Sequence, residues 1–410
     1  MINRTKTLLK LFSIREYALF WIAAVCSNLG VFCLMTGRLW LMQELTDSPA
    51  MLGLLAFSNS LPILLLSVWG GVIADRINRI NLIIITRTFF CIQALITGLL
   101  IALDKIEPWH LILFAILTGV LFALDLPARH SIVANIVPQK NIPDAIVMYS
   151  LIFGGSSIIG PAIFPQLIRI IDVAGVFYFV GIAYLATVIL LSFMHPLSPI
   201  PQDAKVTLMQ EFTKGFKYIR NNRLLRDLIL LTAVIGILGS SYGTILPALT
   251  KNVLQGDVNL YSNLLLIIGV GGLIGTISVG YITDYVDRLI AIKIYICILG
   301  LALLLLANGF VLSLVFASAL ILGFSSSAFG TSTSSYLQIL VDDEFRGRLM
   351  SIYQLGFGLS AFGGLLIGVI AEFIGIEIAI DIFGILIVVF LLLFHVFGNR
   401  SKMNLIDLID

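Results

Sequence analysis

The chain has 410 residues, of which 59% are hydrophobic and only 12% are charged, and its net charge is +2. A soluble globular protein carries about 25% charged residues, so this composition excludes a protein whose whole surface faces water. The net charge says nothing about nucleic acid, and no nucleic-acid partner is predicted. Lipid offers no water to the backbone, and continuous apolar runs about 20 residues long therefore predict membrane-spanning helices.

Hydrophobic runs separated by short polar gaps predict twelve spans. Those of the first half lie near residues 16–42, 53–74, 80–103, 109–136, 142–168 and 174–195. Those of the second half lie near 224–249, 260–283, 289–309, 312–338, 346–371 and 375–397. The intervening segment, 196–223, opens with prolines and then repeats apolar residues at helical spacing among lysines and arginines. It predicts a linker followed by an amphipathic helix on the membrane surface.

The positive residues are divided unequally between the two sides of these spans. With both termini on one side, 21 of the 25 Lys and Arg residues fall on that side, and the other side keeps Arg38, Lys105, Arg169 and Lys251. Cytoplasmic loops are the ones enriched in Lys and Arg, so both termini are predicted to be cytoplasmic. The first apolar run is too long for the core of a cleavable signal peptide.

An internal repeat relates the two halves. The stretch "GGVIADRINR" (70–79) matches "VGYITDYVDR" (279–288) at an offset of 209, an offset that Gly30 and Gly239 share. A looser match joins residues 128–150 to 332–354. The repeat predicts two pseudo-symmetric six-helix bundles, 1–195 and 224–398, joined by a cytoplasmic linker, 196–223, and followed by a cytoplasmic tail, 399–410.

Residues 71–79 resemble the loop 2–3 signature of the major facilitator superfamily, although Asn78 stands where that family usually has glycine. The stretches "ELTDSP" (44–49), "DLPARHSIVANIVP" (125–138) and "GGSSIIGP" (154–161) resemble the branch that holds the enterobactin exporter and macrolide efflux proteins. The resemblance covers nearly the whole chain. It implies an all-α integral membrane protein of the major facilitator fold, working by alternating access in a bacterial-type inner membrane.

The resemblance also implies that the loop after the second span is a gate. Asp75 would meet the positive N-terminal end of the eleventh span when the cytoplasmic side is closed, and Arg129 would keep it charged. Gly71 would let the helices approach closely. In the alternative reading, Arg76 and Arg79 only anchor the loop at the membrane surface, and Asp75 pairs with them.

Ionisable residues inside spans are candidates for function. Asp125 is the candidate proton carrier; alternatively, it is only the ion-pair partner of Arg129, four residues away on the same helical face. Arg38 either extends its side chain to the lipid headgroups or faces the cavity and binds an anionic cargo.

Several uncharged residues inside spans are also candidates. They either line the substrate cavity or join one helix to another: Asn28, Asn59, Tyr242, Ser326 and Gln354. Ser326 belongs to a stretch, 323–338, with eight Ser or Thr residues in sixteen. Gly160 and Pro161 resemble the glycine–proline signature of drug exporters and are a candidate hinge.

The sequence has no Walker A loop and no HExxH motif, and its four histidines are dispersed, so no enzyme, metal or cofactor is predicted. The prediction is a monomeric, proton-coupled siderophore exporter whose partners are a small molecule, protons and the bilayer. The alternatives are a multidrug or macrolide efflux pump, a siderophore importer and a lysophospholipid flippase.

Overall fold

The computed structural model describes residues 11–195, 216–282, 285–309 and 311–398; within its helices the side chains of residues 67–68, 70–76, 130–131, 134, 140, 143, 343–344, 347–348, 357 and 395–398 are left undescribed. Every regular element in these ranges is helical. Eleven helices among the described residues are long and apolar enough to cross a membrane, and the longest contains a break that divides it in two. These findings confirm the predicted all-α membrane fold.

The first half contains a short 3-10 turn (Leu11–Ser13), α2 (Arg15–Thr46), α3 (Pro49–Arg76), α4 (Arg79–Ala102), α5 (Pro108–Ile136), a second 3-10 turn (Gln139–Asn141) and α6 (Ile142–Ser192). The long α6 covers two predicted spans, and Asp172 lies between them at φ 58°. Few residues other than glycine adopt this left-handed conformation. The Asp172 carboxylate accepts a hydrogen bond from the Gly175 backbone N–H at 2.7 Å, which caps the second helical stretch.

The second half has a similar series of helices. Residues 216–221 are helical and lead into α8 (Arg223–Gly239), α9 (Tyr242–Ala248) and a π turn, η3 (Leu249–Val253). Then follow α10 (Val258–Ile282), α11 (Arg288–Ala307), α12 (Leu312–Leu340), α13 (Asp343–Gly358), α14 (Ser360–Ile374) and α15 (Ile376–Gly398). The predicted span 224–249 is therefore α8 with α9, and the predicted span 346–371 is α13 with α14.

The helix boundaries carry the internal repeat. Helices α3 and α10 begin 209 residues apart, and so do α4 and α11. The last pair is also capped in the same way: Asn78 accepts hydrogen bonds from the backbone N–H groups of Ile80 and Asn81, and Asp287 accepts from those of Leu289 and Ile290. Because a side-chain oxygen at this position satisfies N–H groups that the helix leaves free, Asn and Asp serve equally well.

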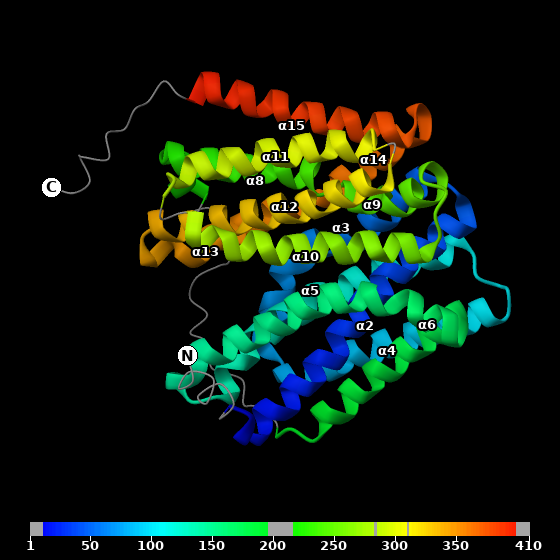
Figure 1. Ribbon diagram of the computed structural model, residues 1–410. Helices are drawn as coiled ribbons and strands as arrows, with labels where there is room; N and C mark the ends of the chain where they lie inside the picture. Colours follow the sequence, from blue (N-terminus) through cyan, green and yellow to red (C-terminus); the bar gives the residue numbers. More distant parts are fainter. Residues whose placement is uncertain (1–10, 196–215, 283–284, 310, 399–410) are drawn as a thin grey trace. The chain divides into compact units, whose positions relative to one another are not determined.

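The chain divides into two compact units: unit 1, Met1–Phe212 with Thr244–Gly269, and unit 2, Thr213–Gly243 with Val270–Asp410. In unit 1, α6 packs along α2 and α4, and α5 packs along α3 and α4. In unit 2, α11 packs against α12 and α15, and α8 packs against α13, α14 and α15 (Figure 1). The described part of the segment 196–223 is residues 216–221 and the start of α8; the predicted linker at 196–215 lies outside the described residues.

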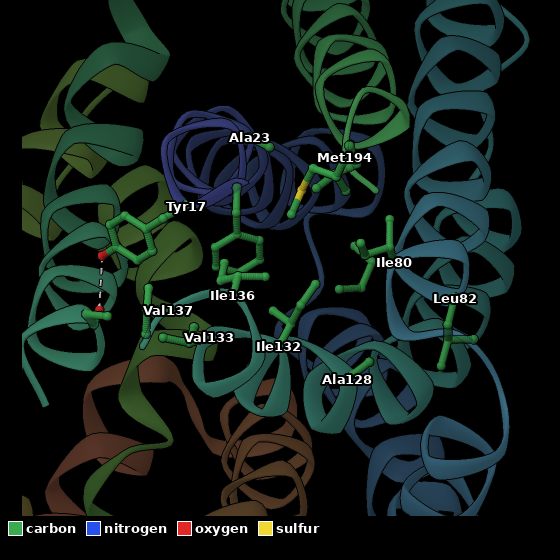
Figure 2. Packing of buried hydrophobic residues seen from close by; sticks show 14 of the residues in the cluster. Tyr17, Ala23, Ile80, Leu82, Ala128, Ile132, Val133, Ile136, Val137 and Met194 are labelled. Atoms are coloured by element: carbon green, nitrogen blue, oxygen red, sulfur yellow. Dashed lines mark hydrogen bonds between the residues drawn. The ribbon is translucent and has the colours of Figure 1, made fainter. Parts of the chain in front are cut away.

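A hydrophobic cluster joins the beginnings of α2 and α4 to the end of α5 and to both ends of α6 (Figure 2). Its side chains include Ala128 and Ile132, neither of which is exposed. The Tyr17 hydroxyl in this cluster donates a hydrogen bond to the Ala145 carbonyl at 3.1 Å. The cluster fixes α5 next to the start of α4, and this contact positions the buried polar residues of both helices.

Candidate functional site

A buried carboxylate in unit 1 is surrounded by two guanidinium groups and one hydroxyl group. Asp125 on α5 is 0% exposed, and its Oδ2 lies 2.5 Å from Nη2 of Arg87 on α4. The same oxygen lies 2.6 Å from Nε of Arg129, one turn along α5; this is an ion pair by distance, without the alignment of a hydrogen bond. The Thr86 hydroxyl donates to Oδ1 at 2.9 Å. These four residues form the Asp125 cluster.

Aromatic rings enclose the two guanidinium groups of this cluster. The Arg87 guanidinium carbon lies 5.1 Å from the centre of the Phe90 ring and 5.8 Å from that of Tyr184. Arg129 lies 6.0 Å from the Phe122 ring centre. Such contacts stabilise a cation by about 0.5–2 kcal/mol, more when water is absent. The rings therefore stabilise the two guanidinium groups, but they add no negatively charged group to the cluster.

A second polar group lies farther along the same helices. Nη1 of Arg38, on α2, donates to the Thr118 hydroxyl at 2.8 Å. Gln93 Nε2 donates to the same hydroxyl at 3.0 Å and to the Phe114 carbonyl at 2.7 Å. Arg38, Gln93 and Thr118 form the Arg38 cluster, and each is at most 5% exposed.

The spacing of residues on α4 and α5 relates the two clusters. Gln93 is seven residues beyond Thr86 on α4, and Thr118 is seven residues before Asp125 on α5. Seven residues are nearly two helical turns, so both helices present the clusters on one face about 10 Å apart. Tyr184 on α6 is fully buried and lies within electrostatic range of Arg38, Arg87 and Arg129.

Some donors in these clusters have no acceptor among the described residues. They are Nε and Nη2 of Arg38, and Nε and Nη1 of Arg87. Nε of Arg129 also makes no aligned hydrogen bond, although it lies against Asp125, and the Tyr184 hydroxyl beside the clusters has no partner among the described residues. A buried donor without an acceptor costs roughly 1–3 kcal/mol. A bound group that brings acceptors would therefore be stabilised here.

The residues of the predicted gate are only partly described. The side chains of Gly71, Asp75 and Arg76 lie outside the described residues. Arg79 is the first residue of α4 and is partly buried. Arg129, which was predicted to pair with Asp75, lies against Asp125, and the gate stays a prediction.

The predicted cavity residues are scattered in the structure. In unit 1, Asn28 is buried and donates to the Ala24 carbonyl of its own helix at 2.7 Å, and Asn59 is partly buried with an unpartnered side-chain oxygen. In unit 2, Tyr242 is buried, Ser326 is partly buried and Gln354 is exposed.

The candidate hinge lies at a close helix contact. The Cys33 thiol of α2 donates to the carbonyl of Gly160 on α6 at 3.4 Å. A Cβ atom added at Gly160 would come within 2.6 Å of the Phe32 side chain. The glycine is therefore needed for packing at this point, and Pro161 follows it inside α6.

Another contact group lies at the end of α2, within unit 1. Gln43 Nε2 donates to Asp47 Oδ1 at 2.7 Å and to Asn252 Oδ1 at 3.3 Å. The Trp40 and Tyr261 rings stack with centres 5.5 Å apart. Gln43 and Asn252 are 209 residues apart, the offset of the internal repeat, so equivalent positions of the two halves contact each other.

Several residues of these clusters were not among the predicted site residues. Arg87 was only one of the 21 Lys and Arg residues assigned to the cytoplasmic side, and Gln93, Thr118 and Tyr184 were not singled out. Arg87 did carry a signal, since it is an arginine within the apolar run of the third span. Among the described residues, no three His, Cys, Asp or Glu side chains are grouped closely enough to hold a metal ion.

Comparison with known proteins identifies relatives over almost the whole chain. A family model described as "Transmembrane secretion effector" matches residues 7–408. The staphyloferrin A transporter of Staphylococcus aureus is 27% identical over 372 residues, which cover 90% of this chain and 93% of the relative. Macrolide efflux protein A of Streptococcus pyogenes is 19% identical, with 95% of this chain and 98% of the relative covered.

Among solved structures, a mutant of the nucleoside transporter NupG matches with a TM-score of 0.75. The match covers 93% of this chain and 99% of that one, with 14% sequence identity. At this identity the likeness shows the fold alone.

Proposed function

Because the chain belongs to the transmembrane secretion effector family of the major facilitator superfamily, we propose that it exports a siderophore-type amphipathic molecule in exchange for protons. Membership in this family makes it a multi-pass membrane transporter and not an enzyme. The expected resemblance to the superfamily is thereby confirmed. The cargo, the direction of transport and the coupling ion are the parts that we propose.

The likeness to the staphyloferrin A transporter supports the siderophore as cargo, since that relative matches along nearly its full length. Export of a macrolide is the second candidate function, supported by the weaker likeness to macrolide efflux protein A. The unequal distribution of Lys and Arg supports a cytoplasmic-membrane location with both termini inside. We propose that the two halves, 1–195 and 224–398, alternate access to a shared path.

The Asp125 cluster is the observation on which we base proton coupling. An ionised Asp125 contacts both Arg87 and Arg129, and thereby joins α4 to α5. A protonated Asp125 carries no charge to hold the two guanidinium groups, so protonation would release them. Proton uptake would thus alter the contact between two helices of the same unit and favour a different conformation.

Transport into everted membrane vesicles tests this coupling. The informative variant carries Asp125→Asn together with Arg129→Gln, because this pair of changes keeps the net charge of the cluster. We expect an acidic vesicle interior to drive accumulation of staphyloferrin A by the unmodified chain. The double variant should accumulate at least ten-fold less under the same gradient. Exchange without a gradient should persist.

Arg129→Gln alone is the matched comparison, because it removes the same guanidinium and keeps the carboxylate. Only the accumulation that the double variant loses beyond this single variant is assigned to Asp125. Normal accumulation by the double variant would remove Asp125 from the coupling. A macrolide accumulated in place of staphyloferrin A would favour the second candidate function.

The proposed topology has its own test. A cysteine at Ser401, in a chain whose four native cysteines are replaced, should be protected from an impermeant thiol reagent added outside intact cells. Labelling of that cysteine before the cells are opened would contradict a cytoplasmic C-terminus.

A further inference from the structure

Unit 1 buries more positive than negative charge. The buried charged side chains among the described residues are Arg38, Arg87, Arg129 and Asp125, and all four belong to unit 1. Their formal charges sum to +2. Removing a charge from water without a partner is costly, and Asp125 can balance only one of the three guanidinium groups. An anion that enters unit 1 would balance the others.

Arg38 is the buried guanidinium that has no carboxylate partner among the described residues. Its one hydrogen bond in the structure is from Nη1 to the neutral hydroxyl of Thr118. Gln93 donates to the same hydroxyl and holds it in place. This contact fixes the Nη1 side of the guanidinium and leaves Nε and Nη2 without acceptors.

Nε and Nη2 form one edge of a guanidinium, and their two N–H groups point in the same direction. A carboxylate accepts two parallel hydrogen bonds from such an edge, which makes this pairing stronger and more specific than a single contact. Tyr184, within electrostatic range of Arg38, has a buried hydroxyl that also lacks a partner. Its ring lies 3.5 Å from the position of a Cβ atom on Gly30, so the packing of α2 holds it there.

We propose that Arg38 and Tyr184 form a binding site for a carboxylate group, with Gln93 and Thr118 as positioning residues. Because two negative charges would balance the excess of +2, we further expect a cargo with two carboxylates rather than one. The proposal rests on the transport function proposed above and names the chemical class of its substrate. The second carboxylate would be attracted by the free Nε and Nη1 of Arg87.

Calorimetric titration of the purified full chain in detergent tests the site. The probes are succinate, acetate, sulfate and the uncharged succinamide, all at one ionic strength. Each titration is read after the heat signal has returned to its baseline, because Arg38 is only 5% exposed and the probe must enter a buried site. We expect succinate to bind at least ten-fold more tightly than acetate or sulfate, and succinamide to show no binding.

Variants distinguish the site from general attraction to a positive protein. Arg38→Gln removes the guanidinium and should lower succinate affinity at least ten-fold. Arg38→Lys, which has no paired N–H edge, should recover only part of this loss. Arg169→Gln removes the same charge from an exposed position of unit 1 and should change affinity less than two-fold. Tyr184→Phe should lower affinity about three-fold to ten-fold.

A lower succinate affinity of Arg38→Gln would not be explained by a loss of folding. Within the described part of the chain, Arg38 is a buried charge without a carboxylate partner, so Arg38→Gln should melt at the same temperature as the unmodified chain or higher. Equal succinate affinity in the two proteins would overturn the proposal. Sulfate bound as tightly as succinate would also overturn it, because the site would then not select carboxylates.

The outcomes separate this proposal from the proposed function. If staphyloferrin A or a macrolide is transported with protons but succinate neither binds nor competes, the carboxylate site is wrong and the transport function stands. If succinate binds through Arg38 but no cargo responds to the proton gradient, the site stands and the coupling is wrong.

Discussion

Unit 1 and unit 2 bury polar groups of different kinds, although the sequence repeat relates the two halves of the chain. The described residues of unit 1 bury three arginines and one aspartate. The described residues of unit 2 include no buried charged residue; their buried polar residues carry hydroxyl groups, on Thr232, Ser241, Ser318, Ser325, Ser332 and Thr333 and on buried tyrosines such as Tyr242. At the repeat offset of 209, Arg87 corresponds to Ile296. At the offset of 204 that relates the later segments, Arg129 corresponds to Thr333.

The difference shows that a repeated backbone does not require a repeated interior. Helix starts and caps recur because they depend on local hydrogen bonds that each half must satisfy by itself. A buried charge depends on partners from other helices, and one half can lose it without changing its helices. In our proposal, the half with the buried charged residues is the one that binds the charged cargo and takes up the proton.

The largest expected effect comes from removing the buried carboxylate of unit 1. Asp125→Asn leaves Arg87 and Arg129 buried without a carboxylate, and should lower the free energy of unfolding by about 3–5 kcal/mol. Denaturant unfolding in detergent measures this change. Adding Arg129→Gln should recover part of the loss, because one unpaired charge is then removed. A single variant as stable as the unmodified chain would mean that the cluster is not a tight ionic contact.

A smaller loss is expected where unit 2 relies on close backbone contact. A Cβ atom at Gly363 on α14 would approach the Ile237 carbonyl oxygen of α8 to 1.8 Å. Gly363→Ala should therefore force the helices apart and cost about 1–3 kcal/mol. Gly280→Ala is the control, since no atom lies within 4 Å of the position of its added Cβ. Equal melting temperatures for the two variants would contradict this packing.

An exposed carboxylate of unit 1 provides a contrast to the buried one. Asp257 precedes α10. Burial raises its pKa, but the hydrogen bonds from the Asn259 side chain and from the backbone N–H groups of Asn259 and Leu260 together lower it more. Because the folded pKa is depressed, the contribution to stability is present above the ordinary carboxyl pKa and is lost as the pH falls below it.

Asp257→Ala should cost about 1 kcal/mol at neutral pH, as the loss of a helix cap does. Asp257→Asn keeps the cap but cannot titrate, so its stability should depend less on pH in the acid range. Thermal melts of both variants at pH 7 and in acid measure the effect. Parallel pH profiles for the Asn variant and the unmodified chain would exclude this contribution.

The smallest effect should have the opposite sign. The Thr333 hydroxyl in unit 2 is fully buried and has no partner among the described residues. Thr333→Val removes an unsatisfied polar group with little change of shape, and should be neutral or raise stability by up to about 1 kcal/mol. A clear loss in the melting temperature would show that the hydroxyl has a partner, such as a bound water.

The sequence by itself determined the helices and the repeat. Apolar runs about 20 residues long permit only membrane-spanning helices, because lipid leaves every backbone group to be satisfied within the segment. The ion pair of Asp125 with Arg129 could also be foreseen, since residues four apart on a helix share a face. The offset of 209 found in the motifs recurs in the starts of α4 and α11.

Only the tertiary structure decided which distant residues meet. Arg87 and Asp125 are 38 residues apart on different helices, and no periodicity in one helix reports the rotation of its neighbour. The packing of α4 against α5 turns Arg87 toward Asp125, and the packing of α2 brings Arg38 to Thr118 but to no carboxylate that the structure describes. Helix periodicity is a local property, whereas the charge balance of a buried site depends on how several helices pack together. The excess of buried positive charge in unit 1 can therefore be recognised only in the folded chain.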